Sequence, residues 1–409
     1  MNQEFIRTIL ENKKTGITDK INMLKNIGFL SEDDGIIQTD NGVEYCGQLI
    51  DESDLSTIIE TLMQQKNIPS QYDELLAMQN SIKIGTEFTF RKDNYMFSLQ
   101  DLANYPNIYD NKQQINDAIQ EIQSWTDRII ESFRGTKIGT IQINNITKSE
   151  GTKKHEGTYA TVKLHFDLYD PKNNRADTWW VNFDLDPFCI ELQTEPVTYD
   201  FYSRYHYVID KCFFNFDGTK CIPDKNEKTG GGGHISLDVE TAFLNEADYL
   251  KNFLVLYTYR AKQESKKQES KAKLIESKDD WNAPFMYEIG EHLAFLELLK
   301  KYHTLARENA TIEWLVENIN KKVYAQLHDE LIKQQVPPNH APHYQAVNLE
   351  HAISSSSSKG RVEIRRYEAQ INIQELLDEL DELYDLLQRG RIHLKLRFNE
   401  DCDKLTFEQ

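Results

Sequence analysis

The chain has 409 residues, and its Asp and Glu residues outnumber its Lys and Arg residues by 66 to 47, for a formal net charge of −19 at pH 7. A chain of this charge repels phosphate backbones, so we expect no nucleic-acid partner. Hydrophobic residues make up 39% of the chain, which is enough for a sizeable core and excludes a disordered acidic protein.

The sequence also indicates where the protein works. No apolar run approaches the roughly 20 residues that span a bilayer, and the first residues lack the apolar stretch of a signal peptide. The five cysteines are scattered, and none forms a CxxC pair. We therefore expect a globular, cytoplasmic protein in a reducing compartment, with no membrane partner.

Residues 1–80 show the spacing of short helices. Leu55, Ile58 and Leu62 recur at helical intervals, and Asp51 and Ser53 are both suitable caps for this helix. The segment carries no motif with chemical meaning. We expect it to be a helical accessory region that recognises a partner.

A strand pattern begins at Ser81, where apolar and polar residues alternate in SIKIGTEFTF. A long helix is predicted to end at Gly135, and another covers residues 199–214. Further strand-like runs occur in TIQINNI, YATVKLHFDLY, TWWVNFDLDPFCIEL and HISLDV. We therefore expect residues 81–252 to be the first part of an α+β domain with a mainly antiparallel sheet.

Residues 253–343 are predicted to form a charged helical insertion. It contains KQESK twice, followed by amphipathic helices over residues 289–302 and 312–331. Residues 344–409 then complete the α+β domain with a strand, a helix and a last strand, in GRVEIRRYEAQ, IQELLDELDELYDLLQRG and RIHLKLRF.

Three carboxylates on strands are candidate site residues. Glu87 lies on the polar side of IGTEFTF, and alternation places Glu191 and Glu195 on one face of IELQTEP. Like charges on one face repel unless a cation or solvent lies between them. These side chains therefore either face water or line a cleft that holds Mg²⁺, which prefers oxygen ligands.

A glycine run precedes a histidine in GGGGHISL. Gly230 to Gly233 form either a flexible turn or a backbone segment that approaches a ligand closely. His234 follows directly and enters an apolar strand, which favours a site over a turn. The alternative is a histidine with a purely structural role.

The segment GRVEIRRY is the most informative one. Alternation puts Glu363 and Arg365 on the same strand face. They form either a simple ion pair or part of an Mg·ATP site, in which the carboxylate binds metal and the guanidinium binds phosphate oxygens. Arg361 and Arg366 add positive charge here, which favours an anion pocket in this acidic chain.

The order of these short motifs resembles that of the amidoligase family, which belongs to the glutamine synthetase and glutamate–cysteine ligase superfamily of carboxylate–amine ligases. The resemblance covers residues 81–240 and 344–370. The matching pieces are Gly85-Thr86-Glu87, Glu191-Leu192 through Pro196, Gly232-Gly233-His234, Asn348-Leu349 and Glu363-Ile364-Arg365-Arg366.

The resemblance implies a curved, mainly antiparallel sheet of glutamine-synthetase type, whose open face holds Mg²⁺ and ATP. Family members phosphorylate a carboxylate with ATP, and an amine then displaces phosphate to form an amide or peptide-like bond. The implied metal ligands are Glu87, Glu191, Glu195, His234 and Glu363. The implied catalytic residues are Glu87, Glu191, His234, Glu363 and Arg365. The implied nucleotide contacts are Gly232, Gly233, Asn348, Arg365 and Arg366.

Two positions depart from the family pattern. The family's G-x-E-x-E has Thr89 at its second glutamate, and its G-x-H-x-H has Ser236 at its second histidine. Each departure removes one metal ligand that the family pattern supplies.

Three functions follow from the sequence. The first is an ATP- and Mg²⁺-dependent ligase acting on a carboxylate and an amine, with a peptide or protein as a substrate. The second is an ATP-dependent phosphotransferase on the same scaffold, and the third is a catalytically inactive family member that acts as a binding protein. GxSxG, HExxH and GxxxxGK[ST] are absent, so nucleophile-elbow hydrolases, zincins and P-loop NTPases have no support.

Overall fold

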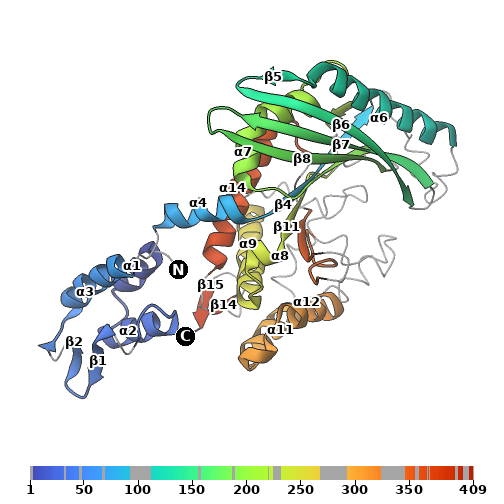
Figure 1. Cartoon of the computed structure of the whole chain (residues 1–409). Helices are drawn as coiled ribbons and strands as arrows, with labels where there is room; N and C mark the ends of the chain where they lie inside the picture. Colours follow the sequence, from blue (N-terminus) through green and yellow to red (C-terminus); the bar gives the residue numbers. More distant parts are fainter. Residues whose placement is uncertain are drawn as a thin grey trace.

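The computed structural model of the protein describes residues 3–31, 34–45, 48–66, 70–92, 112–154, 158–186, 189–219, 221–223, 232–267, 293–323, 346–354, 359–365, 367, 369–391, 395–398 and 405–408. Their buried apolar side chains form two hydrophobic cores. The smaller core runs from Ile6 to Met63, and the larger one runs from Met78 to Leu396. Figure 1 shows the elements of the smaller core at the left, in blue.

The small N-terminal core is built from helices and a three-stranded antiparallel sheet. Its elements are α1 (Gln3–Glu11), α2 (Ile17–Asn26), β1 (Ile36–Thr39), β2 (Gly42–Tyr45), β3 (Gln48–Leu49) and α3 (Glu52–Gln65). Of the two predicted caps, the helix uses Asp51, which shares a capping box with Asp54. The strands were not predicted. Their signal was the turn-forming run Asp40-Asn41-Gly42: Thr39 pairs with Gly42, so Asp40 and Asn41 form the two-residue turn, and Gly42, which has φ 134°, begins β2.

The large core is built on a ten-stranded sheet in which neighbouring strands are antiparallel. The strand order is β12-β13-β11-β4-β9-β8-β7-β6-β5, and β10 also pairs with β4. The strands are β4 (Ile84–Lys92), β5 (Thr136–Ile138), β6 (Ile141–Lys154), β7 (Thr158–Asp170), β8 (Arg175–Asp186), β9 (Cys189–Thr194), β10 (Cys221–Pro223), β11 (His234–Asp238), β12 (Val347–Asn348) and β13 (Arg361–Ile364). The predicted α+β class with a large, mainly antiparallel sheet is confirmed.

Helices cover the apolar face of this sheet and extend beyond it. They are α4 (Gln71–Ser81), α6 (Lys112–Phe133), α7 (Tyr199–Ile209) with a π-helical turn (Asp210–Phe214), α8 (Val239–Phe243), α9 (Ala247–Lys267), α11 (Leu293–His303), α12 (Ile312–Asn318) and α14 (Ile373–Gly390). In Figure 1, α6 lies along the long strands β6, β7 and β8. The remaining described elements are a 3-10 turn (Arg307–Asn309), a second π-helical turn (Ile319–Val323), and a two-stranded sheet of β14 (Lys395–Phe398) and β15 (Leu405–Glu408).

The predicted segment boundaries fall within helices of the large core. Helix α4 spans the predicted boundary at residue 80, and α9 spans the one at residue 252. Met78 of α4, Phe295 of α11 and Leu315 of α12 are all buried in the same core as the sheet. These helices therefore pack on the α+β domain itself.

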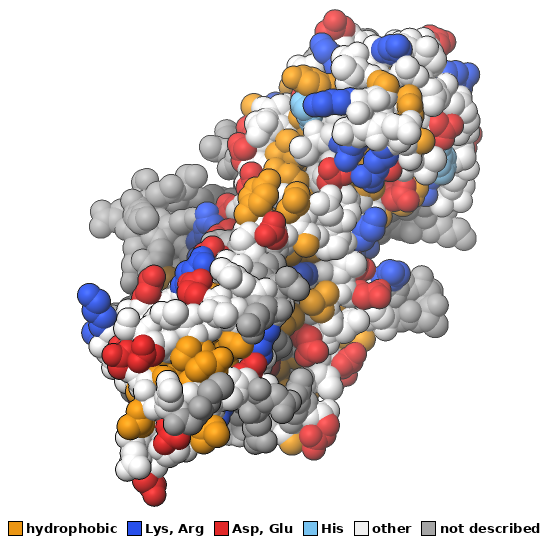
Figure 2. Space-filling view, turned by 60° about the vertical axis from the view of Figure 1, so that its left-hand side comes forward, with side chains coloured by type: hydrophobic (Ala, Val, Ile, Leu, Met, Phe, Trp, Pro, Cys, Tyr) orange, Lys and Arg blue, Asp and Glu red, His pale blue; other side chains and the backbone are white. Residues whose placement is uncertain are grey.

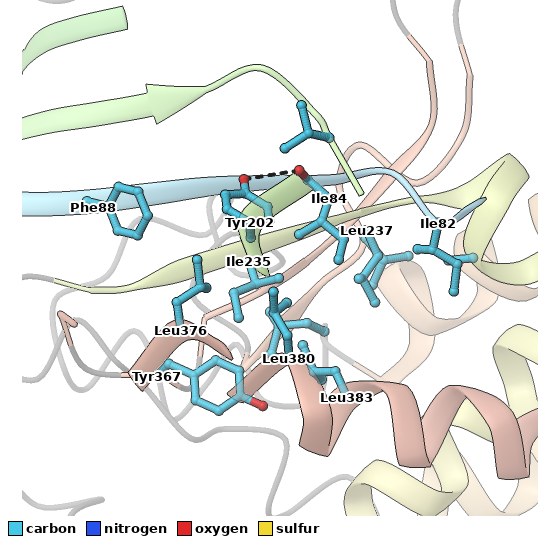
Figure 3. Close-up of a cluster of buried hydrophobic side chains, with 14 of the residues drawn as sticks. Ile82, Ile84, Phe88, Tyr202, Ile235, Leu237, Tyr367, Leu376, Leu380 and Leu383 are labelled. Atoms are coloured by element: carbon cyan, nitrogen blue, oxygen red, sulfur yellow. Dashed lines mark hydrogen bonds between the residues drawn. The ribbon is translucent and has the colours of Figure 1, made fainter. Parts of the chain in front are cut away.

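The core beneath β4 and β11 is apolar. Figure 3 shows Ile84 of β4 and Ile235 and Leu237 of β11 facing Leu376 and Leu380 of α14. Helix α14 follows the predicted amphipathic segment, because its apolar residues recur at helical spacing and meet the sheet.

A buried tyrosine links this core to the sheet. The Tyr202 hydroxyl of α7 lies 2.9 Å from Thr194 Oγ1 and 3.1 Å from Thr86 Oγ1, and it donates a hydrogen bond to the Ile84 carbonyl at 3.3 Å (Figure 3). Burial raises the pKa of Tyr202 to about 12. The neutral hydroxyl therefore joins β4, β9 and α7 directly beneath the polar face described below.

The face of the molecule seen in Figure 2 is of mixed charge. Figure 2 shows acidic and basic side chains interspersed over the visible face, so the net charge of −19 is not gathered in a single patch there. In the part of the chain that the structure describes, no helix combines the length and the apolar character needed to cross a bilayer.

Candidate metal centre

The face of the sheet opposite the apolar core carries polar side chains. Directly paired residues of antiparallel strands point to the same face. Glu87 of β4 pairs with His234 of β11 on one side and with Gln193 of β9 on the other. Gln193 pairs with Asn182 of β8, which pairs with Lys163 of β7. These five residues form a row across the strands, called the polar file below.

Three side chains from three strands converge at one end of this face. His234 Nδ1 lies 2.9 Å from Glu87 Oε1 and 3.4 Å from Glu363 Oε1. One donor atom from each residue lies within 4.8 Å of the other two. The His234 and Glu363 side chains are 8% and 10% exposed, and that of Glu87 is 19% exposed. The cluster is therefore largely removed from bulk water.

This geometry fits a divalent cation. Neighbouring ligands of an octahedral site with bond lengths near 2.1 Å lie about 3 Å apart. Both ring nitrogens of His234 are buried, and Nδ1 is in contact with both carboxylates. In the tautomer that carries its proton on Nε2, Nδ1 would offer its lone pair to an ion held between these carboxylates. Carboxylate oxygens are typical ligands of Mg²⁺ and Mn²⁺, whereas an imidazole nitrogen is a typical ligand of transition metals.

Glu363 is held in place from both sides. Asn348 Nδ2 donates to Glu363 Oε2 at 2.8 Å, and Arg365 Nη1 donates to Oε1 at 3.0 Å. The Glu350 backbone N–H donates to Asn348 Oδ1 at 2.8 Å, which fixes the amide so that its NH₂ group faces Glu363. Asn348, predicted as a nucleotide contact, thus positions a metal-ligand candidate.

The cluster brings two carboxylates next to one guanidinium. Glu87 and Glu363 each carry a negative charge, and Arg365 carries a positive one. Carboxylates this close together repel each other unless a cation lies between them. A divalent cation bound here would therefore be attracted by both carboxylates.

Two predicted ligands lie outside this cluster. Glu191 is on the same face, but it pairs with Thr89 and Asp184, and its Oε2 accepts a hydrogen bond from Gln193 at 3.3 Å. Glu195 Oε2 accepts a hydrogen bond from the Trp180 backbone N–H at 3.2 Å. Of the five predicted metal ligands, the structure brings together Glu87, His234 and Glu363.

The predicted glycine contacts have a packing explanation. A Cβ on Gly233 would overlap the carboxamide of Gln370, whose Nε2 donates to the Gly233 carbonyl at 3.3 Å. The Gly232 carbonyl accepts a hydrogen bond from Thr89 Oγ1 at 3.2 Å. The predicted role of these glycines in nucleotide binding stays a prediction. Gly230, Gly231 and Arg366 lie outside the described residues.

The two departures from the family pattern are accommodated locally. The Thr89 hydroxyl is buried and donates to the Gly232 carbonyl, so it joins β4 to the segment before β11. Ser236 lies between Gly85 and Glu363 across the strands. The chain therefore has a buried hydroxyl and a short polar side chain where the family pattern has metal ligands.

Sequence reasoning did not identify the far end of the polar file. Lys163 and Asn182 lie in the runs YATVKLHFDLY and TWWVNFDLD, whose alternation placed them on the polar side of each strand. The sequence alone does not give the register that aligns these strands with β4.

Comparisons with protein-family models, curated proteins and solved structures give no match for this chain.

Proposed function

We propose that this protein is an ATP- and Mg²⁺-dependent carboxylate–amine ligase on a scaffold of glutamine-synthetase-like type. The observation that supports this proposal is the buried cluster of Glu87, His234 and Glu363, with Arg365 beside it, on the polar face of an antiparallel sheet. These side chains come from three of the motifs that resemble the amidoligase family. They are far apart in the chain and meet at one place.

The residues divide into two roles in this proposal. Glu87, His234 and Glu363 would hold Mg²⁺, while Asn348 keeps the Glu363 carboxylate oriented. A guanidinium has five N–H donors, and Arg365 uses one of them on Glu363, so its remaining donors would contact phosphate oxygens. Bound Mg·ATP would supply the phosphoryl group that activates the substrate carboxylate. The burial of the cluster strengthens each of these electrostatic contacts.

Calorimetric titration of ATP into the protein, with and without Mg²⁺, tests the proposal without knowledge of either substrate. We expect binding that requires Mg²⁺ and that is lost in Glu87→Gln and Glu363→Gln. Glu195→Gln is the matched control, because its carboxylate lies outside the cluster. Absence of Mg²⁺-dependent binding in the wild-type protein, or full binding in Glu87→Gln, would contradict the proposal.

The products of the reaction distinguish a ligase from a phosphotransferase on the same scaffold. A ligase releases free phosphate together with ADP and an amide product. A phosphotransferase releases ADP and leaves the phosphate on the acceptor. Screening acids and amines for phosphate release, followed by mass spectrometry of the product, therefore decides between the two.

One observation favours a binding protein without catalysis as the second candidate. Both oxygens of Glu363 already accept hydrogen bonds from the protein, one from Asn348 and one from Arg365. The cluster is thus also stable as an internal ion-pair network. Thr89 and Ser236, where the family has ligands, agree with this alternative. A folded protein that binds no nucleotide at any Mg²⁺ concentration would favour it.

A further inference from the structure

The small N-terminal sheet has two faces of different character. Ile36 of β1 and Val43 of β2 are 2% exposed and belong to the small core. On the other face, Ile37 of β1 pairs with Glu44 of β2, and Glu44 pairs with Leu49 of β3. Directly paired residues of antiparallel strands share a face. Ile37, Glu44 and Leu49 therefore form one row across the sheet, called the outer row below.

The two ends of the outer row are open to solvent. Ile37 is 58% exposed and Leu49 is 61% exposed in the folded chain. In Figure 1, β1 and β2 lie at the far end of the N-terminal elements from the ten-stranded sheet. A Cβ on Gly42 would come within 3.4 Å of Leu49 Cδ2, so the Leu49 side chain lies along the sheet over the start of β2. Apolar side chains grouped on one exposed face, rather than scattered, are typical of interaction sites.

A carboxylate lies between the two aliphatic side chains. Glu44 is half-buried, and its Oε1 accepts a hydrogen bond from the Thr39 hydroxyl at 3.3 Å. Among the described residues, no basic side chain forms an ion pair with Glu44. Residues 1–66, called the N-terminal unit below, contain 12 Asp and Glu residues and 6 Lys and Arg residues, for a net charge of −6. Three of these basic residues already pair with acids within the unit. The outer row is therefore complementary to a cationic partner.

A second copy of this chain does not match this face. Two outer rows packed on each other about a two-fold axis would bring the Glu44 carboxylates of both copies into one interface. Like charges at such a contact repel each other. A partner that places a Lys or Arg side chain between two apolar ones complements all three positions of the row.

An α-helix has the spacing that this row requires. Strands lie about 4.7–4.9 Å apart, so the two intervals from β1 to β3 span roughly 9–10 Å. A helix rises about 1.5 Å per residue, so positions i, i+4 and i+7 lie on one side of it and span about 10.5 Å. Successive turns of a helix that crosses the strands would therefore meet successive members of the row.

We infer that the outer row binds a cationic amphipathic helix of another protein. Apolar residues at positions i and i+7 of this helix lie on Ile37 and Leu49, and a Lys or Arg at position i+4 pairs with Glu44. The inference does not rest on the proposed function, because the outer row and the metal centre belong to different sheets.

Fluorescence anisotropy with a fluorescein-labelled, alanine-rich helical peptide of about 18 residues that contains Leu-x-x-x-Lys-x-x-Leu tests this inference. We expect Leu49→Ser to weaken binding about fivefold to tenfold, because an apolar contact is lost. Glu44→Lys should weaken it roughly tenfold or more, because the ion pair becomes a repulsion. Leu76→Ser, at a side chain of α4 that is 44% exposed, is the apolar control. Glu11→Lys is the charge control, since it changes the charge of the N-terminal unit by the same amount at an exposed position of α1. Both controls should bind as the wild type does.

A charge swap locates the contact. The same peptide with Glu in place of its lysine should bind the wild-type protein more weakly than the original peptide does, and Glu44→Lys should recover part of this loss. Equal losses in Glu44→Lys and Glu11→Lys would overturn the inference, because only the overall charge of the unit would then matter. No binding of the original peptide to the wild type, or an unchanged affinity in Leu49→Ser, would also overturn it. So would a wild-type dimer in sedimentation velocity that dissociates in Leu49→Ser, since a second copy would then occupy the face.

Discussion

The carboxylate of Glu363 and the guanidinium of Arg365 lie 3.0 Å apart, with side chains only 10% and 9% exposed. The two residues are two positions apart on an extended segment, so they share one face. For a pair buried to this extent, the attraction between the two charges offsets the free-energy cost of removing them from water. Removal of one partner loses the attraction while the other charge stays buried. The fold therefore depends on the presence of both members of the pair that would bind Mg·ATP in the proposed function.

Breaking this pair should destabilise the fold. We expect Glu363→Gln to lower the free energy of unfolding by about 3–5 kcal/mol, because Arg365 stays buried without its carboxylate. The double variant Glu363→Gln/Arg365→Met should recover part of the loss. Urea unfolding of the single and double variants measures this coupling. Glu240→Gln is the control, since Glu240 and Lys359 form an exposed pair whose contribution should stay within about 1 kcal/mol.

Asn348 should tune metal affinity without being a ligand. Outer-shell partners of metal ligands typically change affinity by about 10–100-fold when they are removed. We therefore expect Asn348→Ala to weaken Mn²⁺ binding by about that factor, as measured by the loss of the free-ion signal in electron paramagnetic resonance. Glu87→Gln should weaken it at least as much. Glu191→Gln should have little effect, because Glu191 lies outside the cluster; equal losses in all three variants would contradict the assignment.

A side chain at Gly233 should displace the Gln370 carboxamide from its hydrogen bonds with the Gly233 carbonyl and Glu379. A Cβ at this position would overlap the Gln370 carboxamide, so we expect Gly233→Ala to cost about 1–3 kcal/mol of stability. Gln370→Ala in the same background should restore part of the loss by removing the obstruction. Gly85→Ala is the matched control within the sheet, because its Cβ would meet its nearest neighbours at 3.7–3.9 Å. Thermal unfolding of the three variants checks this, and similar melting temperatures for the two alanine variants of glycine would refute the packing argument.

The hairpin between β7 and β8 should make the fold sensitive to acid. Asn173 Nδ2 donates to the Asp170 carboxylate, and Arg204 pairs with it at 3.2 Å, so the pKa of Asp170 lies below its ordinary value of 3.8. A lowered pKa in the folded state stabilises the protein above the unfolded-state pKa, and this contribution is lost as the pH falls through the folded-state pKa.

We therefore expect Asp170→Asn to be less stable than wild type at pH 7 and the difference to shrink below about pH 4. Melting temperatures measured from pH 7 to pH 3 test this. A difference that is constant over the whole range would show that the carboxylate charge has no role.

Short-range features of this protein follow from the sequence alone. The helical spacing of apolar residues in IQELLDELDELYDLLQRG predicted α14, and alternation placed Glu363 and Arg365 on one strand face. Both patterns depend on residues a few positions apart, which share a face for geometric reasons. The order of the motifs also implied one group of metal ligands, of which the structure brings three together, namely Glu87, His234 and Glu363, but not Glu191 and Glu195.

Long-range features were decided by strand pairing. His234 meets Glu87 because β11 pairs with β4 in a register that places the two residues opposite each other. Glu191 of β9 instead pairs with Thr89, two residues along β4 from Glu87. Alternation along one strand cannot distinguish these positions, since a shift of register by two residues keeps every side chain on its face but changes its neighbour. The local pattern thus determined which residues are polar and which face they share. Only the tertiary structure decided that Asn348 holds Glu363, that Gln370 fills the space beside Gly233, and that Lys163 lies in the same file as Glu87, because these contacts join separate strands and loops of the chain.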